Sequence, residues 1–344
     1  MRMRRAVVTA LIGAVLSGGL AACGSAGTSD GASAGASAGG EAGAGPGGTA
    51  PAAAGFPRTV QHAMGTTEIA AQPRRVVALD QSFVDAALTL DTPVVGYTTY
   101  RSIEDTLPGY LAPVLDDARE AVSVGTLEAP SLEKIAALRP DLILSAKVRH
   151  EALYDKLGRI APTVFSETTG AKWKDNLRLV GRALGKEDLA EQRIKEYEDR
   201  AAAIGEEITA GNGGTPPTVS IIRFAGEPTV RLYVENSYSG IVLRDAGLVR
   251  PKGQPTTTDT VAVNLSEERI PEMDADHIFL AAYDDPSVGP VKQRFEANPL
   301  WGRLKGGIHE VPDITWMTAV GIQGAHAILD DLATTFGVDP ARPS

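Results

Sequence analysis

The sequence contains one cysteine in 344 residues, so a disulfide bond within the chain is impossible. Basic residues are also in the minority, because 33 lysines and arginines stand against 43 aspartates and glutamates, which gives a net charge of −10. A nucleic-acid partner is therefore not expected, since nucleic acids bind to clustered positive charge. The apolar run at residues 6–16 is too short to span a membrane as a helix.

Clusters of metal ligands and of catalytic residues are missing as well. The spacing typical of a metal site is absent from the five histidines, which are His62, His150, His277, His309 and His326. A nucleophile-elbow pattern occurs at residues 27–31, but this segment follows no expected strand and opens no expected helix. The sequence therefore predicts no metal ligands and no catalytic residues.

The N-terminus has the order of a secretory signal peptide, which we place at residues 1–22. Arg2, Arg4 and Arg5 precede the short apolar run, and the sequence Leu-Ala-Ala-Cys ends at Cys23. This stretch resembles a bacterial lipobox. The resemblance implies that Cys23 becomes the lipidated N-terminus of the mature protein, anchored in the cell membrane on its extracytoplasmic face.

Residues 23–55 consist mostly of glycine, alanine and serine. Such a segment cannot bury enough apolar surface to fold, so we expect a flexible tether between the membrane and the folded part. A flexible chain of this length has a root-mean-square span of about 30 Å. Folded structure is expected to begin near Phe56.

A short pattern occurs twice in the chain, at residues 131–144 and again at residues 266–280. With an offset of 135 residues, a serine, a glutamate, an aspartate and several apolar residues coincide in the two copies. Each copy predicts a short helix that starts at the serine and is followed by a buried strand. The repeat therefore predicts two similar lobes.

Strands and helices alternate through the folded part, which predicts parallel α/β sheets. Strands are expected at residues 76–79 and 93–96 with a helix between them, and the second lobe is expected to begin with a strand at residues 218–224. A helix over residues 187–208 is long enough to join the lobes, although a surface helix of one lobe also fits. We expect an N-terminal lobe at 56–170, a helical segment at 171–210 and a C-terminal lobe at 211–344.

The whole chain resembles the helix-linked (class III) substrate-binding lipoproteins of ABC importers for ferric siderophores. The stretches that carry the resemblance are residues 75–80, Gly125 with 131–144, residues 236–248, and Thr315-Trp316 with the closing helix. It implies a non-enzymatic, monomeric binding protein with two α/β lobes, each a mostly parallel sheet flanked by helices, joined by one long helix. The ligand would lie in the cleft between the lobes.

The implied ligand is a ferric siderophore whose chelator holds the iron, so the protein needs no cofactor of its own. The implied partners are an ABC permease and its ATPase. Haem, cobalamin or another metal chelate are alternative ligands, and haem fits because tyrosines are available as axial ligands. A sensor lipoprotein and a membrane-anchored hydrolase are the alternatives outside transport.

The resemblance also assigns roles to individual residues. Glu133 and Glu268 hold matching positions in the repeat and correspond to the surface glutamates that, in this family, dock onto arginines of the permease. The simpler interpretation is that each carboxylate only stabilises the start of its helix through the helix dipole. A pocket for an anionic chelate needs arginines and aromatic side chains. The expected ligand-binding residues are Tyr100, Arg101, Arg223, Tyr238 and Trp316. The alternative interpretations are an ion pair for Arg223, a solvated loop for Tyr100 and Arg101, and a core position for Trp316.

Overall fold

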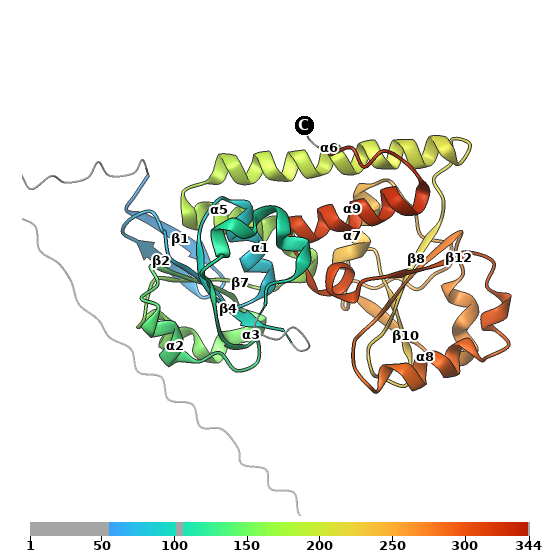
Figure 1. The fold of residues 1–344 in the computed structure, drawn as a ribbon, viewed down its shortest axis with the longest axis horizontal. Coiled ribbons are helices and arrows are strands. Elements are labelled where there is room, and N and C mark those ends of the chain that lie inside the picture. Colours follow the sequence, from blue (N-terminus) through green and yellow to red (C-terminus); the bar gives the residue numbers. More distant parts are fainter. Residues whose placement is uncertain (1–54, 101–105, 343–344) are drawn as a thin grey trace, which may run out of the picture. The chain divides into compact units, whose positions relative to one another are not determined.

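The first sheet consists of five parallel strands in the order β5-β4-β3-β6-β7 (Figure 1). The computed structural model describes residues 55–100 and 106–342. The strands of this sheet are β3 (Val76–Ala78), β4 (Val94–Thr99), β5 (Val122–Thr126), β6 (Leu142–Ala146) and β7 (Thr163–Ser166). Strands β3 and β6 are buried at every position, as expected for a parallel sheet that is covered on both faces.

Helices cover both faces of this first sheet. They are α1 (Gln81–Thr89), α2 (Leu132–Ala137), α3 (Lys147–His150), α4 (Tyr154–Gly158) and the 3₁₀ helices η1 (Gly109–Ala118), η2 (Glu151–Leu153) and η3 (Gly170–Lys172). Successive side chains of a strand point to opposite faces. Val76 and Ala78 accordingly pack into one hydrophobic core and Val77 into another.

An antiparallel hairpin precedes the first sheet and was not expected from the sequence. It is formed by β1 (Arg58–His62) and β2 (Gly65–Ile69). The backbone N–H of Ala63 donates to the carbonyl of Phe165 at 3.0 Å, which ties the turn of the hairpin to β7. The hairpin strands are mostly polar and half-exposed, so they lack the apolar run that marks the buried strands.

The second sheet is mixed, with the order β10-β9-β8-β11-β12. Its strands are β8 (Val219–Phe224), β9 (Val230–Tyr233), β10 (Ala262–Leu265), β11 (His277–Ala282) and β12 (Gly307–Val311). Strands β8, β11 and β12 are parallel, whereas β9 and β10 are antiparallel to their neighbours. Only residues 225–229 separate β8 from β9, which is too short a connection for a parallel crossover.

The helices of the second lobe complete the same α/β arrangement. They are α7 (Tyr238–Asp245), α8 (Val288–Glu296), α9 (Ile322–Phe336), the 3₁₀ helices η4 (Glu267–Met273) and η5 (Trp301–Arg303), and one π turn, η6 (Ile314–Thr318). The second copy of the repeat forms a short helix after Ser266, as the sequence predicted, and this helix is the 3₁₀ helix η4. Pro271 inside this element cannot donate the hydrogen bond of a regular α-helix.

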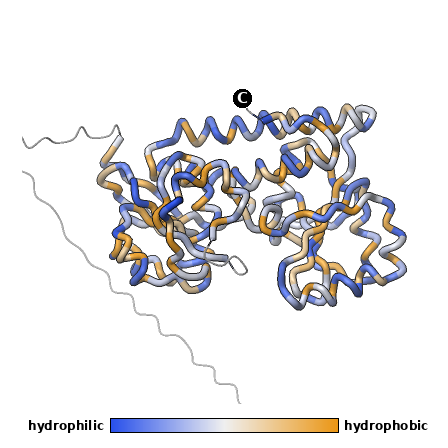
Figure 2. The backbone as a smooth tube through the Cα atoms, in the orientation of Figure 1, coloured by the Kyte–Doolittle hydropathy of each residue, from blue (hydrophilic) through white to orange (hydrophobic). Residues whose placement is uncertain are grey.

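A 25-residue helix, α6 (Glu187–Gly211), follows α5 (Trp173–Leu184) and joins the two lobes, as the sequence predicted. It packs on α5 on one side and on α7 and α9 on the other (Figure 1). Polar and apolar residues alternate along it in Figure 2, as expected for a helix with one buried face. No helix among residues 55–100 and 106–342 has the length and apolarity needed to cross a membrane.

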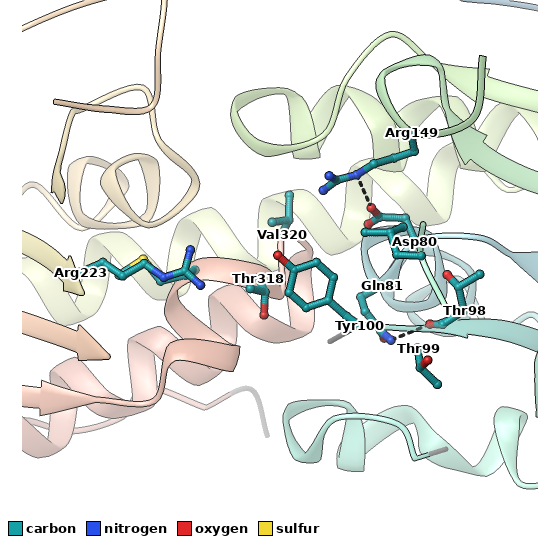
Figure 3. A pocket seen from close by; sticks show the side chains of 11 residues that line it. Asp80, Gln81, Thr98, Thr99, Tyr100, Arg149, Arg223, Thr318 and Val320 are labelled. Carbon is teal, nitrogen blue, oxygen red and sulfur yellow. Dashed lines mark hydrogen bonds and ion pairs between the residues drawn. The ribbon is translucent and has the colours of Figure 1, made fainter. Parts of the chain in front are cut away.

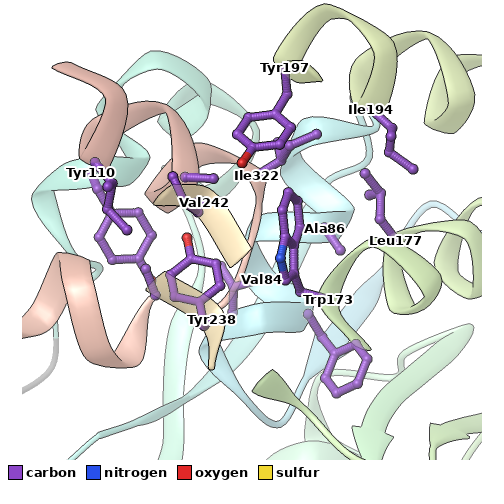
Figure 4. Packing of buried hydrophobic residues seen from close by; sticks show 14 of the residues in the cluster. Val84, Ala86, Tyr110, Trp173, Leu177, Ile194, Tyr197, Tyr238, Val242 and Ile322 are labelled. Atoms are coloured by element: carbon purple, nitrogen blue, oxygen red, sulfur yellow. The ribbon is translucent and has the colours of Figure 1, made fainter. Parts of the chain in front are cut away.

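One hydrophobic core contains residues of both lobes and of α6 (Figure 4). Trp173 of α5 packs edge-on against Tyr197 of α6, with ring centroids 5.1 Å apart, and against Tyr238 of α7, at 6.0 Å. Gly205 of α6 allows the closest approach, because a Cβ there would lie 1.8 Å from the carbonyl oxygen of Ala246. The lobes are therefore held in one packed body rather than linked by a free hinge.

A buried carboxylate reinforces this connection. Asp85 of α1 accepts backbone hydrogen bonds from Ile322 at 3.0 Å, Gln323 at 3.0 Å and Gly324 at 3.3 Å, which are the first residues of α9. These N–H groups have no partner inside the helix, so the carboxylate satisfies them across the lobe boundary. Burial raises the pKa of Asp85 to about 7, although the hydrogen bonds act in the opposite direction.

Candidate functional site

The cleft between the lobes begins at the carboxyl ends of the parallel strands, where ligands gather in α/β sheets. A cavity of about 60 Å³ lies there (Figure 3). The first lobe contributes Asp80, Gln81, Thr98, Thr99, Tyr100, Leu127 and Arg149, and the second lobe contributes Arg223, Met317, Thr318 and Val320. Both lobes therefore supply polar side chains to one site.

Arg149 is the cation of the first lobe. It follows β6 on α3, and its Nε donates to Oδ2 of Asp80 at 3.0 Å. Asp80 is the N-cap of α1 and accepts hydrogen bonds from the backbone N–H and the hydroxyl of Ser82. This cap fixes the carboxylate, and the carboxylate in turn holds Arg149 at the cavity.

The second lobe contributes the cation Arg223, which is the penultimate residue of the buried strand β8. Its guanidinium forms a two-bonded ion pair with Asp313, with distances of 2.6 and 2.7 Å, and its Nη1 donates to the Tyr233 hydroxyl at 3.4 Å. The side chains of the pair are 8% and 10% exposed. Burial acts to lower the pKa of Arg223, but Tyr233 and Asp313 raise it overall, so the guanidinium stays charged.

Two buried polar atoms at this cavity have no hydrogen-bond partner among residues 55–100 and 106–342. They are Oε1 of Gln81 and Oγ1 of Thr98. The side-chain amide of Gln81 donates to the carbonyl of Thr98 at 3.1 Å, which fixes the Gln81 side chain. An unsatisfied buried polar atom costs about 1–3 kcal/mol, so the site is suited to a polar ligand group or a water molecule.

A second cavity of about 450 Å³ adjoins the first one and shares Tyr100 and Thr318 with it. Its other lining residues are residues 106–109, Ala282, Tyr283, Asp284, Pro312, Asp313 and Ile314. We call the two cavities together the interlobe cleft. The Arg223 guanidinium lies 5.7 Å from the ring centroid of Tyr283, so cationic and aromatic groups converge on the cleft.

Metal coordination by the protein has no geometric basis in the part of the chain that the structure describes. No group of three histidine, cysteine, aspartate or glutamate side chains in residues 55–100 and 106–342 could hold an ion. The cleft instead offers guanidinium groups, hydroxyls and aromatic faces. These groups are suited to a large anionic ligand with apolar parts.

The structure brings together two of the five residues that the sequence predicted at the ligand site. Tyr100 and Arg223 line the cleft from opposite lobes. Arg101 lies outside the described residues. The remaining two predictions require a correction, because Trp316 and Tyr238 line neither cavity of the cleft.

Trp316 and Tyr238 are core residues. Trp316 is fully buried in η6, stacks on Phe279 and donates from Nε1 to Asp331 at 2.8 Å. Tyr238 is 4% exposed, and its hydroxyl donates to the carbonyl of Gly321 at 2.7 Å. Ser237 caps α7, so Tyr238 is the first residue of this helix and lies in the core.

The sequence analysis did not predict three charged residues of the cleft. They are Arg149, its ion-pair partner Asp80, and Asp313, which pairs with Arg223. A signal for Arg149 was present. It follows within three residues of the buried strand at 142–146, and ligands gather at the carboxyl ends of such strands. Asp313 had no such signal, because its pairing with Arg223 joins residues 90 positions apart.

The two glutamates of the repeat have matching surroundings. Glu133 and Glu268 are both exposed, and each accepts a hydrogen bond from the serine two residues before it. The bond from Ser131 is 3.1 Å and that from Ser266 is 2.6 Å. The Ser266 hydroxyl lowers the pKa of Glu268, which keeps this carboxylate charged.

The aspartates of the repeat also match in structure. Asp141 accepts from the backbone N–H groups of Arg74 and Arg75, just before β3. Asp276 accepts from the N–H and the hydroxyl of Thr218, just before β8. Each aspartate thus joins the start of its own strand to the start of the central strand of its sheet. The offset of 135 residues therefore reflects a structural repeat. Cys23, the predicted lipidation site, lies outside the described residues.

Comparison with known proteins gives consistent results. The chain matches the model of a family described as periplasmic binding protein over residues 76–309. It is 37% identical over 294 residues to the probable siderophore-binding lipoprotein YfiY of Bacillus subtilis (strain 168), which covers 81% of this chain and 87% of that protein. It is 30% identical over 272 residues to the achromobactin-binding periplasmic protein of Dickeya dadantii (strain 3937), with 77% and 87% covered.

A solved structure agrees in fold over nearly its whole length. The crystal structure of Staphylococcus aureus SirA complexed with staphyloferrin B superposes with a TM-score of 0.74 and 34% sequence identity. The match covers 82% of this chain and 99% of that one.

Proposed function

Because the chain belongs to the periplasmic binding protein family, we propose that it captures a ferric siderophore in the interlobe cleft and delivers it to an ABC importer. The names of the relatives YfiY and SirA with staphyloferrin B support this ligand class. The observation that carries the proposal is one arginine from each lobe at the cleft, Arg149 and Arg223. Two guanidinium groups favour a chelate that carries negative charge.

The ion pairs at the cleft give this site its proposed binding mode. Arg149 and Arg223 each pair with an aspartate, with Nε–carboxylate distances of 3.0 and 2.6 Å. An anionic ligand group can add to the remaining guanidinium donors while the aspartates keep the arginines in place. The iron would stay within its chelator, and the protein would supply no direct ligand to it.

The proposal is tested by calorimetric titration of the protein with five ligands in parallel: ferric citrate, an anionic ferric catecholate, a cationic ferric hydroxamate, haem and cobalamin. The three hydrophobic cores consist of residues that follow Gly55, so the protein from Gly55 onward is suitable. We expect one-to-one binding of an anionic ferric chelate and weaker binding of the cationic one. Binding of haem or cobalamin alone would replace the proposed substrate.

We further propose that the protein is lipidated at Cys23, is held on the extracytoplasmic face of the membrane, and docks onto its permease through Glu133 and Glu268. The exposure of both glutamates in matching surroundings on the two lobes supports this role. Exposed carboxylates that meet arginines of a partner fix orientation and association rate.

Replacing Glu133 and Glu268 together by alanine is expected to stop uptake of the iron complex while ligand affinity stays unchanged. The reason is that both side chains are exposed and contact neither cavity of the cleft. Uptake of ⁵⁵Fe-siderophore by cells that carry the variant measures the effect. The matched control replaces Glu120 and Glu206, two other exposed glutamates. Normal uptake by the Glu133/Glu268 variant would refute the docking role.

A further inference from the structure

The second lobe contains another cavity that shares no lining residue with the interlobe cleft. Its volume is about 440 Å³, and it lies between the face of β8 that is covered by α7 and the segment that follows α7. We call it the α7 pocket. Its apolar part is formed by Val219 and Ile221 of β8 together with Leu243 and Leu248. This part has the character of a ligand site for a hydrocarbon group.

Charge at the α7 pocket is mostly positive. Arg244, Arg250 and Lys252 line it together with one carboxylate, that of Glu235, which leaves a net charge of two positive units. The carboxylate of Glu235 lies 3.9 Å from the guanidinium of Arg244, so its negative charge mainly offsets the charge of that arginine. Lys252 and Arg250 form no ion pair within residues 55–100 and 106–342.

Arg250 is the central group of this pocket. Its guanidinium is half-buried, and its hydrogen bond within the described part of the chain runs from Nη2 to the carbonyl of Pro255 at 3.1 Å. Burial lowers the pKa of Arg250, and the charge of Glu235 only partly offsets this effect. A partly desolvated guanidinium with one neutral acceptor has further donors that suit an anionic partner.

A second observation is independent of Arg250. Gln254 lines the same pocket and is 9% exposed. Its Nε2 donates to the Ser220 hydroxyl at 2.5 Å and to the Glu272 carbonyl at 3.0 Å, while its buried Oε1 has no partner. Unsatisfied buried acceptors are rare in folded proteins, and this one suits a donor such as a bound water molecule.

We propose that the α7 pocket is a second ligand site, which binds a small carboxylic acid with an apolar body. The carboxylate pairs with Arg250, and the apolar body lies on Val219, Ile221 and Leu248. A purely inorganic anion would leave the apolar part unfilled, and a neutral amphiphile would leave Arg250 without a counter-ion. Both the apolar and the cationic parts of the pocket are therefore used by a single ligand class.

The position of the pocket places this ligand next to the interlobe cleft. Val219, Ile221 and Arg223 alternate along β8 and point to the same face of the sheet. Tyr233 lines the α7 pocket, while its hydroxyl accepts the hydrogen bond from Arg223. The two sites are thus adjacent on one strand, although their openings are formed by different residues.

The test uses octanoate as the probe, titrated into the protein from Gly55 onward and followed by calorimetry and by protein NMR. We expect saturable binding of one octanoate per chain. Arg250→Met is expected to weaken this binding by about tenfold or more, because it removes a charged hydrogen bond. The matched control is Arg303→Met, which removes an exposed arginine of the same lobe that lies outside the pocket.

A second variant keeps the test decisive if Arg250→Met fails to fold. Val249 lies at the pocket and is 45% exposed, so Val249→Trp fills the opening without overpacking the core. It is expected to abolish octanoate binding. Equal binding of 1-octanol, saturation by inorganic phosphate with the same affinity, no octanoate binding, or octanoate binding that survives both variants would each overturn the proposal. The siderophore titration is a separate measurement, so the two proposals fail independently.

Discussion

Replacing Arg149 and Arg223 together by glutamine is expected to weaken binding of the ferric chelate by on the order of a thousandfold. Truncation of one partner in a buried, hydrogen-bonded charge pair costs about 2–5 kcal/mol, and each 1.4 kcal/mol is a factor of ten in affinity. The two arginines come from different lobes, so the double variant removes the cationic contact on both sides of the cleft. Calorimetric titration with the chelate that binds the wild-type protein measures the effect.

The control for this prediction is Arg231→Gln. Arg231 lies opposite Arg223 on the neighbouring strand and pairs with Glu227, but it lines neither cavity of the cleft. Arg149→Gln alone is the second variant, because Arg149 is at the surface and its loss leaves the buried pair of Arg223 intact. An unchanged dissociation constant in the double variant would show that the ligand binds elsewhere.

Asp85→Ala is expected to lower the free energy of unfolding by about 3–5 kcal/mol. The change removes one carboxylate from three backbone N–H groups at the start of α9, and each unsatisfied buried donor costs about 1–3 kcal/mol. Denaturant unfolding measures the loss. Asp116→Ala is the matched control, because this exposed aspartate pairs with Arg119 on the surface and its loss should change stability by about 0.5 kcal/mol or less.

The same carboxylate predicts a pH dependence with a definite sign. The pKa of Asp85 is about 7 in the folded protein and near 3.8 when the chain is unfolded, because burial disfavours the charged form. Between pH 4 and 7 the folded state therefore binds more protons than the unfolded state, and its stability falls as the pH rises, with a slope of at most about 1.4 kcal/mol per pH unit.

Asp85→Asn isolates this contribution, since the amide cannot titrate. The stability advantage of the wild-type protein over this variant should shrink as the pH rises from 4 through the folded-state pKa of about 7, and level off once the carboxyl is fully ionised. An advantage that grows with pH would mean that the helix N–H groups dominate over burial and hold the pKa of Asp85 below its ordinary value.

The fold was largely predictable because its signals are local. Buried strands such as β6 appear as short apolar runs, and the expected helix at 187–208 lies within α6 because its apolar residues recur at helical spacing. The hairpin of β1 and β2 was not predictable in this way, because its residues are mostly polar and its tie to Phe165 is a distant backbone contact.

The candidate site was predicted less completely, because it depends on contacts between distant residues. Arg223 stood out as a charged residue in an apolar strand, and the structure places it at the cleft. Trp316 was assigned by resemblance alone, yet the structure buries it against Phe279 and Asp331. Whether an aromatic residue faces a cleft or a core is decided by its packing against elements that are distant in the sequence, which periodicity within one element does not reveal.

The most direct test of the central claim is to locate the iron in a crystal of the complex, by anomalous diffraction at the iron absorption edge. The crystal contains the protein from Gly55 onward with the ferric chelate that the titration selects. The account predicts one strong iron peak in the interlobe cleft, between Arg149 and Arg223, with chelator oxygens near both guanidinium groups. An iron peak in the α7 pocket or on the outer surface, with the cleft empty, would contradict it.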